Sequence, residues 1–375
     1  MLPESVLKQL KALEACLREY YSQATLPQAP DSIERREFGF TSFDGGFRRH
    51  MSFRSAQEFW TYVVRNAPRD AYFSVARYTN PTHEMHAKGW ESADLPFDLD
   101  AEQVLRTDDP LVKAGWISDQ NYELIKREFL KLLEDFLERD FGLSRGDYQL
   151  AFSGGRGYHV RVTAKAYADM DQRMRRQIVE YVALGPKPAD ATFEKKKGRV
   201  YPFTHGYGWN RRVFNWLKSM DQSQVNLPAK ATVQRIAEAA KRCASPEEFS
   251  ISQFQTGVFA QLMRKAVDEC TVSIDERVTV DVNRLLRAPG TVHGGSGLLC
   301  TPLQRSEIER FNPVEQASMK LKTTRRIKVG KLPFKVSVNG EELAPEQAGS
   351  AVEVNTGLAY YVVVRRGGLF ADEII

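Results

Sequence analysis

Apolar residues recur at intervals of three and four in several stretches of the chain, which is the spacing of an amphipathic helix. This spacing predicts helices over residues 6–21, 118–141, 170–181 and 231–243. Ser118 and Asp119 offer an N-cap for the second of these helices, and Gly142 offers a stop. The longest helices therefore lie in the first two thirds of the chain.

Shorter runs rich in aromatic and β-branched residues predict strands between these helices. The segment 35–53 places five phenylalanines around Gly45-Gly46 and predicts a hairpin or a twisted sheet edge. Further strands are expected over residues 72–78, 94–100, 148–162 with a glycine-rich turn, 325–336 and 352–364, the last including the strand-sized apolar run 358–364. Helices and strands together indicate the α+β class.

The middle of the chain differs in character from its flanks. Residues 168–258 predict a mostly helical insertion, so the expected domains are a discontinuous one, 1–167 with 259–375, and the insertion 168–258. Basic and aromatic residues alternate from Lys195 to Lys218. These residues can follow a nucleic-acid backbone and stack on bases, or the aromatics can form core and the lysines a solvated face. The core interpretation is favoured for the aromatics.

Composition narrows the class of protein only modestly. The 375 residues are 42% hydrophobic and 27% charged, with a net charge of +5, which is compatible with a polyanionic partner. Four scattered cysteines, without a C-x-x-C pair, argue against a disulfide framework and a Cys-rich zinc site. No apolar run has the length of a membrane span and no secretory signal is present, so we expect no membrane partner and a cytoplasmic location.

The most informative polar feature is the pair Asp98 and Asp100 within the expected strand 94–100. Side chains two residues apart on a strand point to the same face, so these carboxylates lie close together and repel each other unless a cation separates them. Two divalent cations held by such a pair are typical of phosphoryl and nucleotidyl transfer. The alternative is a strand end with two solvated acids.

A glycine-rich turn in the segment 152–160 is the second feature. Glycines let backbone N–H groups approach an anion closely, and Ser153, Arg156 and His159 add the donors that a triphosphate requires. The alternative is a purely structural turn between two strands.

A third constellation lies near residue 280. Arg287 and His293 have the character of phosphate ligands, and Asp275 or Asp281 could complete a carboxylate triad. Structural interpretations compete here as well, because Asp281 could instead cap a helix that begins at Val282. The residues alone leave the choice between the two aspartates open.

The order of these motifs resembles that of the catalytic small subunit of archaeal and eukaryotic DNA primase. The similarity runs from about residue 35 to 300. It rests on the D-x-D strand, S-G-x-R-G-Y-H, an aspartate ahead of R-L-L-R-x-P-x-x-x-H-G, and the upstream segments R-E-F-G-F, R-H-x-S-F, Y-F-S-V-A-x-Y and K-G-W.

The resemblance implies a mixed-sheet primase catalytic core with an inserted helical subdomain. It also selects Asp275, which stands twelve residues before Arg287 and eighteen before His293, as the third carboxylate. The implied ligands of Mg²⁺ or Mn²⁺ are Asp98, Asp100 and Asp275. The implied triphosphate ligands are Ser153, Arg156, His159, Arg287 and His293, with Arg49, His50 and Lys88 as weaker candidates for nucleotide or template contact.

The implied activity is that of a DNA-directed RNA polymerase. It makes short RNA primers, with DNA as a second possible product, on single-stranded DNA by two-metal nucleotidyl transfer. The implied partners are the template, nucleoside triphosphates and the primase large subunit, in the cytoplasm at the nucleoid of an archaeon or in a eukaryotic nucleus. The alternatives are a primase-polymerase of DNA repair, a two-metal nuclease and a non-catalytic nucleic-acid-binding module.

Three positions depart from the family pattern. Family members often carry a small zinc site soon after the D-x-D strand, but residues 101–120 contain no Cys and no His, so no zinc site is expected. Gly155 and Gly295 stand where relatives often have basic residues. None of these departures affects the three carboxylates.

Overall fold

The computed structural model describes residues 3–25, 29–105, 108–186, 194–196, 198–221, 223, 225–227 and 229–371, and for 194–196 the backbone alone. The chain forms two compact units. The first comprises Met1–Phe129, Ser144–Arg175 and Ile274–Ile375, and the second comprises Leu130–Leu143 and Arg176–Ser273. The domain limits expected from the sequence, with an insertion over 168–258, stay a prediction.

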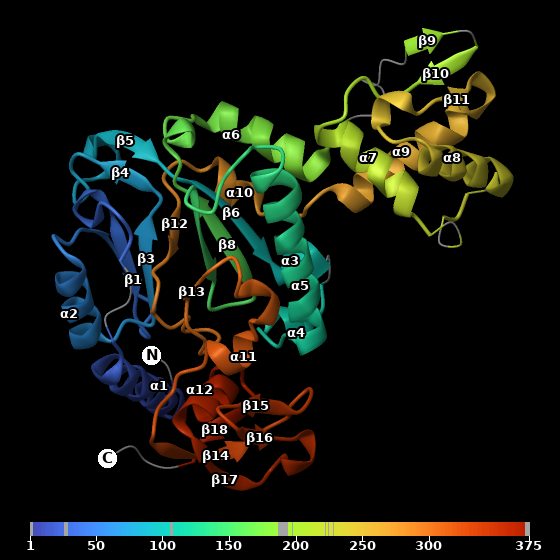
Figure 1. Cartoon of the computed structure of the whole chain (residues 1–375). Helices are drawn as coiled ribbons and strands as arrows, with labels where there is room; N and C mark the ends of the chain where they lie inside the picture. The colour runs from blue at the N-terminus through green and yellow to red at the C-terminus, as the bar shows by residue number, and fades with distance from the viewer. Residues whose placement is uncertain are drawn as a thin grey trace. The chain divides into compact units, whose positions relative to one another are not determined.

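Two four-stranded antiparallel sheets form the body of the first unit (Figure 1). The first sheet has the order β12 (Leu285–Arg287), β3 (Asp70–Ser74), β1 (Phe38–Thr41) and β2 (Phe47–Met51). The second has the order β13 (Thr301–Leu303), β7 (Tyr148–Phe152), β8 (Gly157–Val162) and β6 (Leu95–Asp100). A separate pair is formed by β4 (Ala76–Tyr78) and β5 (Trp90–Ala93).

The second sheet is apolar on one face and polar on the other, as the period of two requires. Its apolar face packs on α5 (Asp119–Lys131), where the rings of Tyr158 and Phe129 stack with centroids 5.2 Å apart. Its polar face carries Asp98, Asp100 and His159. Burial of one face therefore fixes which side of the sheet presents the chemistry.

Further helices flank these sheets in the first unit. They are α1 (Glu4–Gln23), α2 (Ala56–Asn66), α3 (Ala101–Leu105), α4 (Pro110–Lys113), α6 (Gln172–Val179, which crosses into the second unit), α10 (Glu276–Val280) and α11 (Pro313–Gln316).

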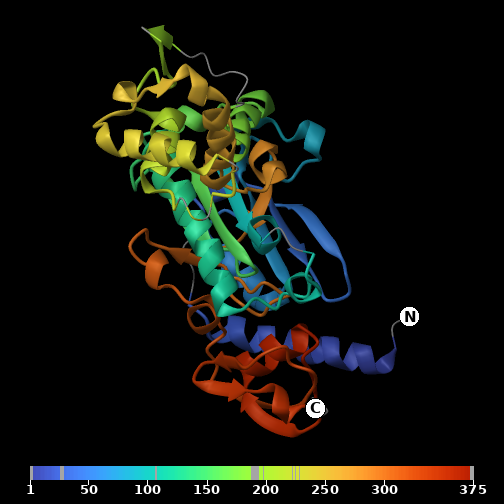
Figure 2. The ribbon, with the colours of Figure 1, turned by 90° about the vertical axis from the view of Figure 1, so that its right-hand side faces the viewer.

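The last part of the first unit is a small sheet with a buried helix. The strands β14 (Thr324–Val329), β17 (Ala351–Asn355) and β18 (Gly368–Phe370) form one sheet, and β15 (Val336–Val338) pairs with β16 (Glu341–Leu343). Helix α1 lies beside β18 (Figure 2), and the Gln9 side chain both donates to and accepts from the backbone of Phe370, at 3.1 and 2.9 Å.

The apolar run 358–364 is helical, so the strand expected over 352–364 is wrong in its second half. It belongs to α12 (Thr356–Val364), which begins where the Asn355 side chain accepts the backbone N–H of Leu358. This helix is buried on nearly every side and therefore lacks the polar stripe that identifies a helix in sequence.

The second unit is mainly helical. Its helices are η3 (Leu132–Glu138, of π type), η5 (Glu180–Leu184, of π type), α7 (Gly208–Ser219), α8 (Lys230–Arg242) and α9 (Thr256–Cys270). A small sheet has the order β11 (Ile251–Ser252), β10 (Arg199–Tyr201) and β9 (Glu194–Lys196). Phe203, Trp209 and Phe214 are buried in this unit, which confirms the core interpretation for these aromatics.

The other helices and strands largely follow the sequence expectations. The helices expected over 6–21 and 231–243 and the interrupted strands over 148–162 are confirmed. The helix expected over 118–141 changes from α to π type after Lys131. The strand expected over 72–78 is divided at Val75, and α2 was not expected because aromatic residues dominate its surroundings. Within the described residues, no helix is both long and apolar enough to cross a membrane.

Candidate functional site

Asp98 and Asp100 lie at the end of β6, on the polar face of the second sheet. In the ladder with β8, Asp98 is opposite His159 and Asp100 is opposite Gly157. Asp98 Oδ1 is 3.3 Å from His159 Nδ1. The strand therefore presents two carboxylates side by side, with an imidazole directly across from the first.

Asp100 is held in an environment that disfavours its charged form. Burial raises the pKa of its carboxyl group to about 6; the charge of Asp98 adds to this rise and Arg156 opposes it. Asp100 Oδ2 lies 3.1 Å from Arg156 Nη2, whereas Oδ1 is buried and has no hydrogen-bond partner in the part of the chain that the structure describes. An unsatisfied buried acceptor of this kind requires an explanation, and a bound cation supplies one.

Asp275 is brought to the same strand by a backbone contact. Its N–H donates to the carbonyl of Asp98 at 2.9 Å. Its carboxylate is the N-cap of α10 and accepts from the N–H groups of Arg277 and Val278. Asp281 instead ends α10 and accepts from Asn283, so the helix suggested to begin at Val282 is wrong.

The three aspartates have side chains of the type that binds divalent cations, although they are not gathered as a complete metal site. In the described part of the chain, no three His, Cys, Asp or Glu side chains are gathered as a ready metal site. Carboxylate oxygens are nevertheless the ligands that Mg²⁺ and Mn²⁺ prefer, and Asp100 Oδ1 is an unused one. Metal binding by Asp98, Asp100 and Asp275 stays a prediction, and it requires Asp275 to divide its oxygens between the helix cap and the ion.

The turn between β7 and β8 is shaped by glycine. Gly154 has φ of +76°, and a Cβ there would lie 2.8 Å from the backbone N of Cys300. Ser153 Oγ accepts the N–H of Gly155 at 3.1 Å. Arg156 extends from the turn to Glu102, at 2.6 Å, as well as to Asp100. The turn thus places a hydroxyl and a guanidinium directly beside the acidic strand.

The surroundings of His159 favour its protonated form. Burial lowers its pKa, but the interactions with Asp98 and Cys300 together outweigh burial and raise the pKa to about 9. Its Nε2 is buried without a hydrogen-bond partner among the described residues. The imidazolium can therefore donate to an anion without giving up its contact with Asp98.

Arg287 and His293 meet around Asp70, a residue that sequence reasoning missed. Arg287 Nη1 lies 2.6 Å from Asp70 Oδ1, and the guanidinium stacks on Tyr72. The same Asp70 oxygen accepts the N–H of Gly294, which follows His293. Burial and the charge of Arg287 lower the pKa of His293 well below its usual value. Asp70 stands just before the Y-F-S-V-A-x-Y segment, but no partner at a local spacing indicated this role.

A cavity of about 220 Å³ adjoins these basic residues. His159 and Arg161 from β8 line it, together with Phe73, Arg287 and Cys300. The triphosphate candidates His159 and Arg287 therefore share one hollow, although they belong to different sheets.

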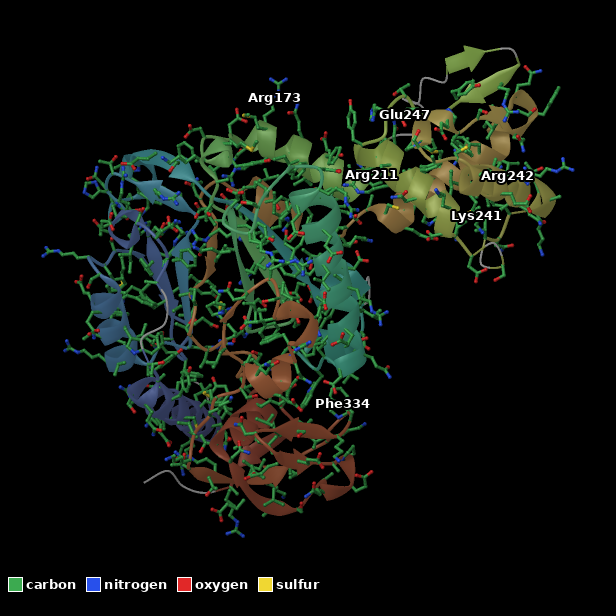
Figure 3. The ribbon with its side chains drawn as sticks, viewed as in Figure 1. Arg173, Arg211, Lys241, Arg242, Glu247 and Phe334 are labelled. Atoms are coloured by element: carbon green, nitrogen blue, oxygen red, sulfur yellow. The ribbon has the colours of Figure 1, made fainter. Side chains whose placement is uncertain are left out.

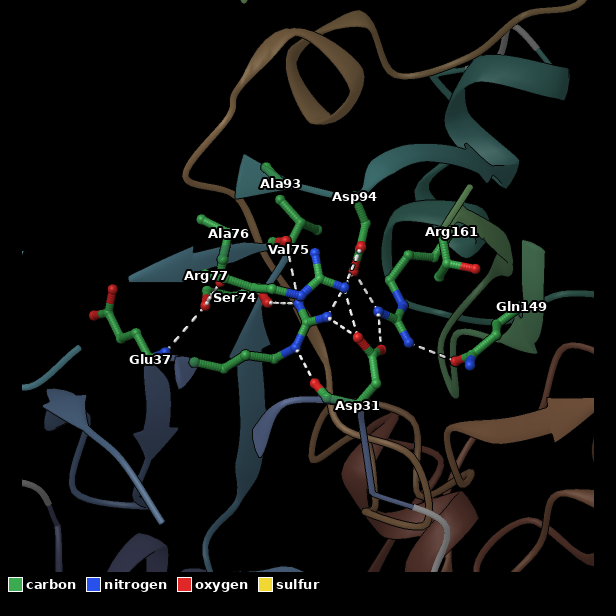
Figure 4. Close-up of polar contacts among 12 residues, drawn as sticks. Asp31, Glu37, Ser74, Val75, Ala76, Arg77, Ala93, Asp94, Gln149 and Arg161 are labelled. Atoms are coloured by element: carbon green, nitrogen blue, oxygen red, sulfur yellow. Dashed lines mark hydrogen bonds and ion pairs between the residues drawn. The ribbon is translucent and has the colours of Figure 1, made fainter. Parts of the chain in front are cut away.

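The start of β6 is anchored by a buried ion-pair network (Figure 4). Asp94 is only 2% exposed and binds Arg36 and Arg77, each at 2.9 Å, as well as Arg161. Asp31 pairs with the same three arginines. The strand that carries Asp98 and Asp100 is therefore fixed at Asp94, directly before its first residue.

Arg49, His50 and Lys88 surround one buried acid. Arg49 Nε lies 2.9 Å from Glu37, Lys88 Nζ 3.5 Å and His50 Nδ1 3.6 Å. The structure brings these three side chains together, and a contact with nucleotide or template stays a prediction.

The structure thus places an acidic strand beside a set of basic donors bordered by glycines, and the binding of a triphosphate with divalent cations there stays a prediction. The DNA primase small subunit family matches residues 97–305 of this chain. The DNA primase small subunit PriS of Methanococcoides burtonii is 32% identical over 91% of this chain and 94% of its own length. The PriS proteins of Methanothrix thermoacetophila and Halorubrum lacusprofundi are 33% and 31% identical over 81% and 91% of this chain and 85% and 93% of their own lengths.

The chain therefore belongs to the DNA primase small subunit family. The matched region includes the acidic strand, the glycine turn and the segment from Asp275 to His293.

Proposed function

We propose that this chain is the catalytic subunit of a DNA primase and makes short RNA primers on single-stranded DNA from nucleoside triphosphates. The observation that carries the proposal is the pairing of Asp98 with His159 across β6 and β8. It puts candidate metal ligands and candidate phosphate ligands on adjacent strands. The arrangement supports a primase catalytic core built on the two antiparallel sheets.

Asp98, Asp100 and Asp275 would hold Mg²⁺ or Mn²⁺. When bound, these ions would lower the pKa of the attacking 3′-hydroxyl and neutralise charge on the leaving pyrophosphate. The strand β6 fixes the first two carboxylates, and the contact from Asp275 N–H to Asp98 keeps the third beside them. The buried, unpaired Asp100 Oδ1 supports this assignment.

The basic residues would bind and orient the triphosphate. Ser153 and Arg156 act from the turn, His159 from β8, Arg287 from the end of β12 and His293 from the segment after it. Fixed donors of this kind contribute roughly 2–4 kcal/mol each when they are aimed at developing charge in a preorganised site. The pairings of Arg156 with Asp100 and of Arg287 with Asp70 hold both guanidinium groups in place before substrate binds.

The template is proposed to contact the second unit as well. This unit holds 17 Lys and Arg against 13 Asp and Glu, so it carries +4 of the net +5 charge. Lys241 and Arg242 end helix α8 on its surface (Figure 3). Phe254 is 88% exposed and follows β11, which pairs with β10 opposite Arg199. An exposed aromatic ring near basic residues suits single-stranded nucleic acid.

A primase large subunit is the further partner that we propose, since the family generally works as a heterodimer. The curated relatives above are archaeal, which favours action at the nucleoid of an archaeal cell.

The test is primer synthesis from labelled nucleoside triphosphates on single-stranded DNA, with Mg²⁺ or Mn²⁺, with and without the large subunit. Labelled primers that disappear in Asp98→Asn would support the proposal. Degradation of the template without synthesis would indicate a two-metal nuclease. Extension of supplied primers without initiation would favour a repair polymerase, and neither synthesis nor degradation would favour a binding module.

A further inference from the structure

Arg365 follows α12 and lies outside the segments that carry the candidate site, but hydrogen bonds connect it to residues beside these segments. It is 3% exposed. Its Nε donates to the carbonyl of Gly115 at 2.8 Å, and its Nη1 donates to the carbonyls of Ser296 and Tyr361. The guanidinium also lies 3.5 Å from the centroid of the Tyr361 ring. One buried cation thus joins three segments that are far apart in sequence.

The bond to Ser296 reaches the His293 side of the site. Ser296 N–H donates to the carbonyl of His293 at 3.0 Å, within one tight turn. Ser296 Oγ donates to the carbonyl of Gly154 in the glycine turn. Holding Ser296 therefore holds the His293 turn against the segment that carries Ser153 and Arg156.

The bond to Gly115 reaches the Arg156 side of the site. Gly115 N–H donates to the carbonyl of Val112 at 3.0 Å. The same carbonyl accepts Nη1 of Arg156 at 3.4 Å. Another partner of that guanidinium, Asp100, belongs to the acidic strand. Three hydrogen bonds in sequence thus connect Arg365 to the Arg156 side chain.

We propose that Arg365 is a positioning residue that fixes the spacing between the Arg156 side and the His293 side of the triphosphate site. This inference rests on the proposed nucleotide site. Only a guanidinium fits the role, because its planar fork donates in several fixed directions, whereas a lysine ammonium is a single point on a flexible stem. Arg365 would act on nucleotide binding without touching the nucleotide.

The experiment compares the variants Arg365→Lys and Arg365→Gln with Arg366→Gln. The last is the matched control, because Arg366 is the neighbouring arginine and is exposed. Primer extension gives kcat and KM for the nucleoside triphosphate and KM for the primer–template, and thermal unfolding monitors the fold. The expected result is a KM for nucleotide at least tenfold higher, with kcat within about threefold and an unchanged KM for primer–template. Arg366→Gln should match the wild type.

A purely structural role would instead lower the melting temperature and the active fraction, which changes kcat and leaves KM for nucleotide unchanged. That outcome in folded Arg365 variants would overturn the inference. If these variants do not fold, Ser296→Ala is the second test: it removes a hydroxyl that donates to the carbonyls of Gly154 and His293 and accepts the N–H of Leu298. It should raise KM for nucleotide about threefold, and an unchanged KM would then count against the inference.

The two proposals fail in different ways. A wild-type protein that makes no primers overturns the proposed function, and binding of a fluorescent nucleoside triphosphate then tests Arg365 directly. Weaker binding in Arg365→Lys supports its positioning role. Equal binding, or no binding by the wild type, overturns that role.

Discussion

Asp98 and His159 occupy opposing positions of one antiparallel ladder, with 3.3 Å between Oδ1 of the acid and Nδ1 of the imidazole. The acid shapes the ionisation of both its neighbours, His159 and Asp100. The carboxylate keeps His159 protonated, and the charge on Asp98 contributes to the raised pKa of Asp100. The acidic and basic halves of the site are therefore one electrostatic unit.

Replacing either strand carboxylate should remove activity and leave the fold intact. Asp98→Asn and Asp100→Asn each delete a proposed metal ligand, so we expect primer synthesis to fall by at least 10³-fold. Asp100→Asn should melt no lower than the wild type, because it removes a charge that burial disfavours. Primer synthesis and calorimetry check both statements.

The matched control for these variants is Asp108→Asn, since the Asp108 side chain is 99% exposed and outside the site. A normal rate in Asp98→Asn or Asp100→Asn would contradict the assignment.

The pair Asp98 and Asp100 shows how much of the candidate site could be predicted from the sequence. Alternation along a strand is a local property, so the shared face of Asp98 and Asp100 followed from two residues of spacing. The glycine turn was equally local. The choice of Asp275 required the family spacing, and its contact with the Asp98 backbone is a long-range fact that no local pattern encodes.

The parts that sequence reasoning missed depend on packing between distant segments. Asp70 acquires its role only when β3 pairs with β12, and Arg365 only when α12 is buried. The helix α12 itself was mistaken for strand because complete burial erases the polar stripe of a helix. Helices with one solvated face, such as α1 and α8, were predicted because that stripe is present.

Loss of the Arg287 guanidinium should weaken the use of nucleotide strongly. Arg287→Gln removes a fixed donor, and we expect kcat/KM for the nucleoside triphosphate to fall about 10²-fold. Asp70→Asn keeps the donor but removes its anchor at 2.6 Å, so its effect should be smaller, about three- to tenfold.

Steady-state extension of a supplied primer measures both effects, and Arg310→Gln, at an exposed site, serves as control. A larger loss in Asp70→Asn than in Arg287→Gln would show that the acid, and not the guanidinium, carries the function.

His293 should make stability depend on pH below neutrality. Its folded pKa is lowered well below that of the unfolded chain, about 6.5, by burial and by Arg287. The unfolded state alone then binds a proton as the pH falls below 6.5, so this contribution is complete above 6.5 and declines below it. The decline is at most about 1.4 kcal/mol per pH unit for one proton.

Urea unfolding between pH 5 and 7.5 measures how the free energy of unfolding changes with pH. His293→Asn should flatten this slope, because Asn does not titrate. The fold should survive, because the Asn side chain can also accept the N–H of Gly295 that now bonds to His293 Nδ1. His159 contributes with the opposite sign, because its raised pKa stabilises the fold below 6.5 and this is lost as the pH rises through about 9. An identical slope in the variant would show that His293 is not buried neutral.

The exposed ring of Phe254 should contribute to binding of single-stranded DNA. Stacking of a base on an aromatic side chain is worth roughly 1–3 kcal/mol, so Phe254→Ala should weaken binding by about five- to 150-fold. Arg199→Gln should make the affinity for DNA less dependent on salt concentration, by the amount expected for the loss of about one phosphate contact.

Fluorescence anisotropy of labelled oligonucleotides at several salt concentrations checks both variants. Leu369→Ala is the control, because that side chain is 57% exposed and belongs to the first unit. Equal affinities for wild type and Phe254→Ala would place the template elsewhere.

The contact between Gln9 and Phe370 has a consequence for how the protein is made in the cell. The Gln9 side chain, near the start of α1, forms its hydrogen bonds with the backbone of β18, which is synthesised about 360 residues later. During translation α1 therefore emerges early, α2 can cover part of its apolar face through the contact of Tyr21 with Trp60, and the part beside β18 is covered only after that strand has left the ribosome. Ribosome-associated chaperones are expected to protect it throughout elongation.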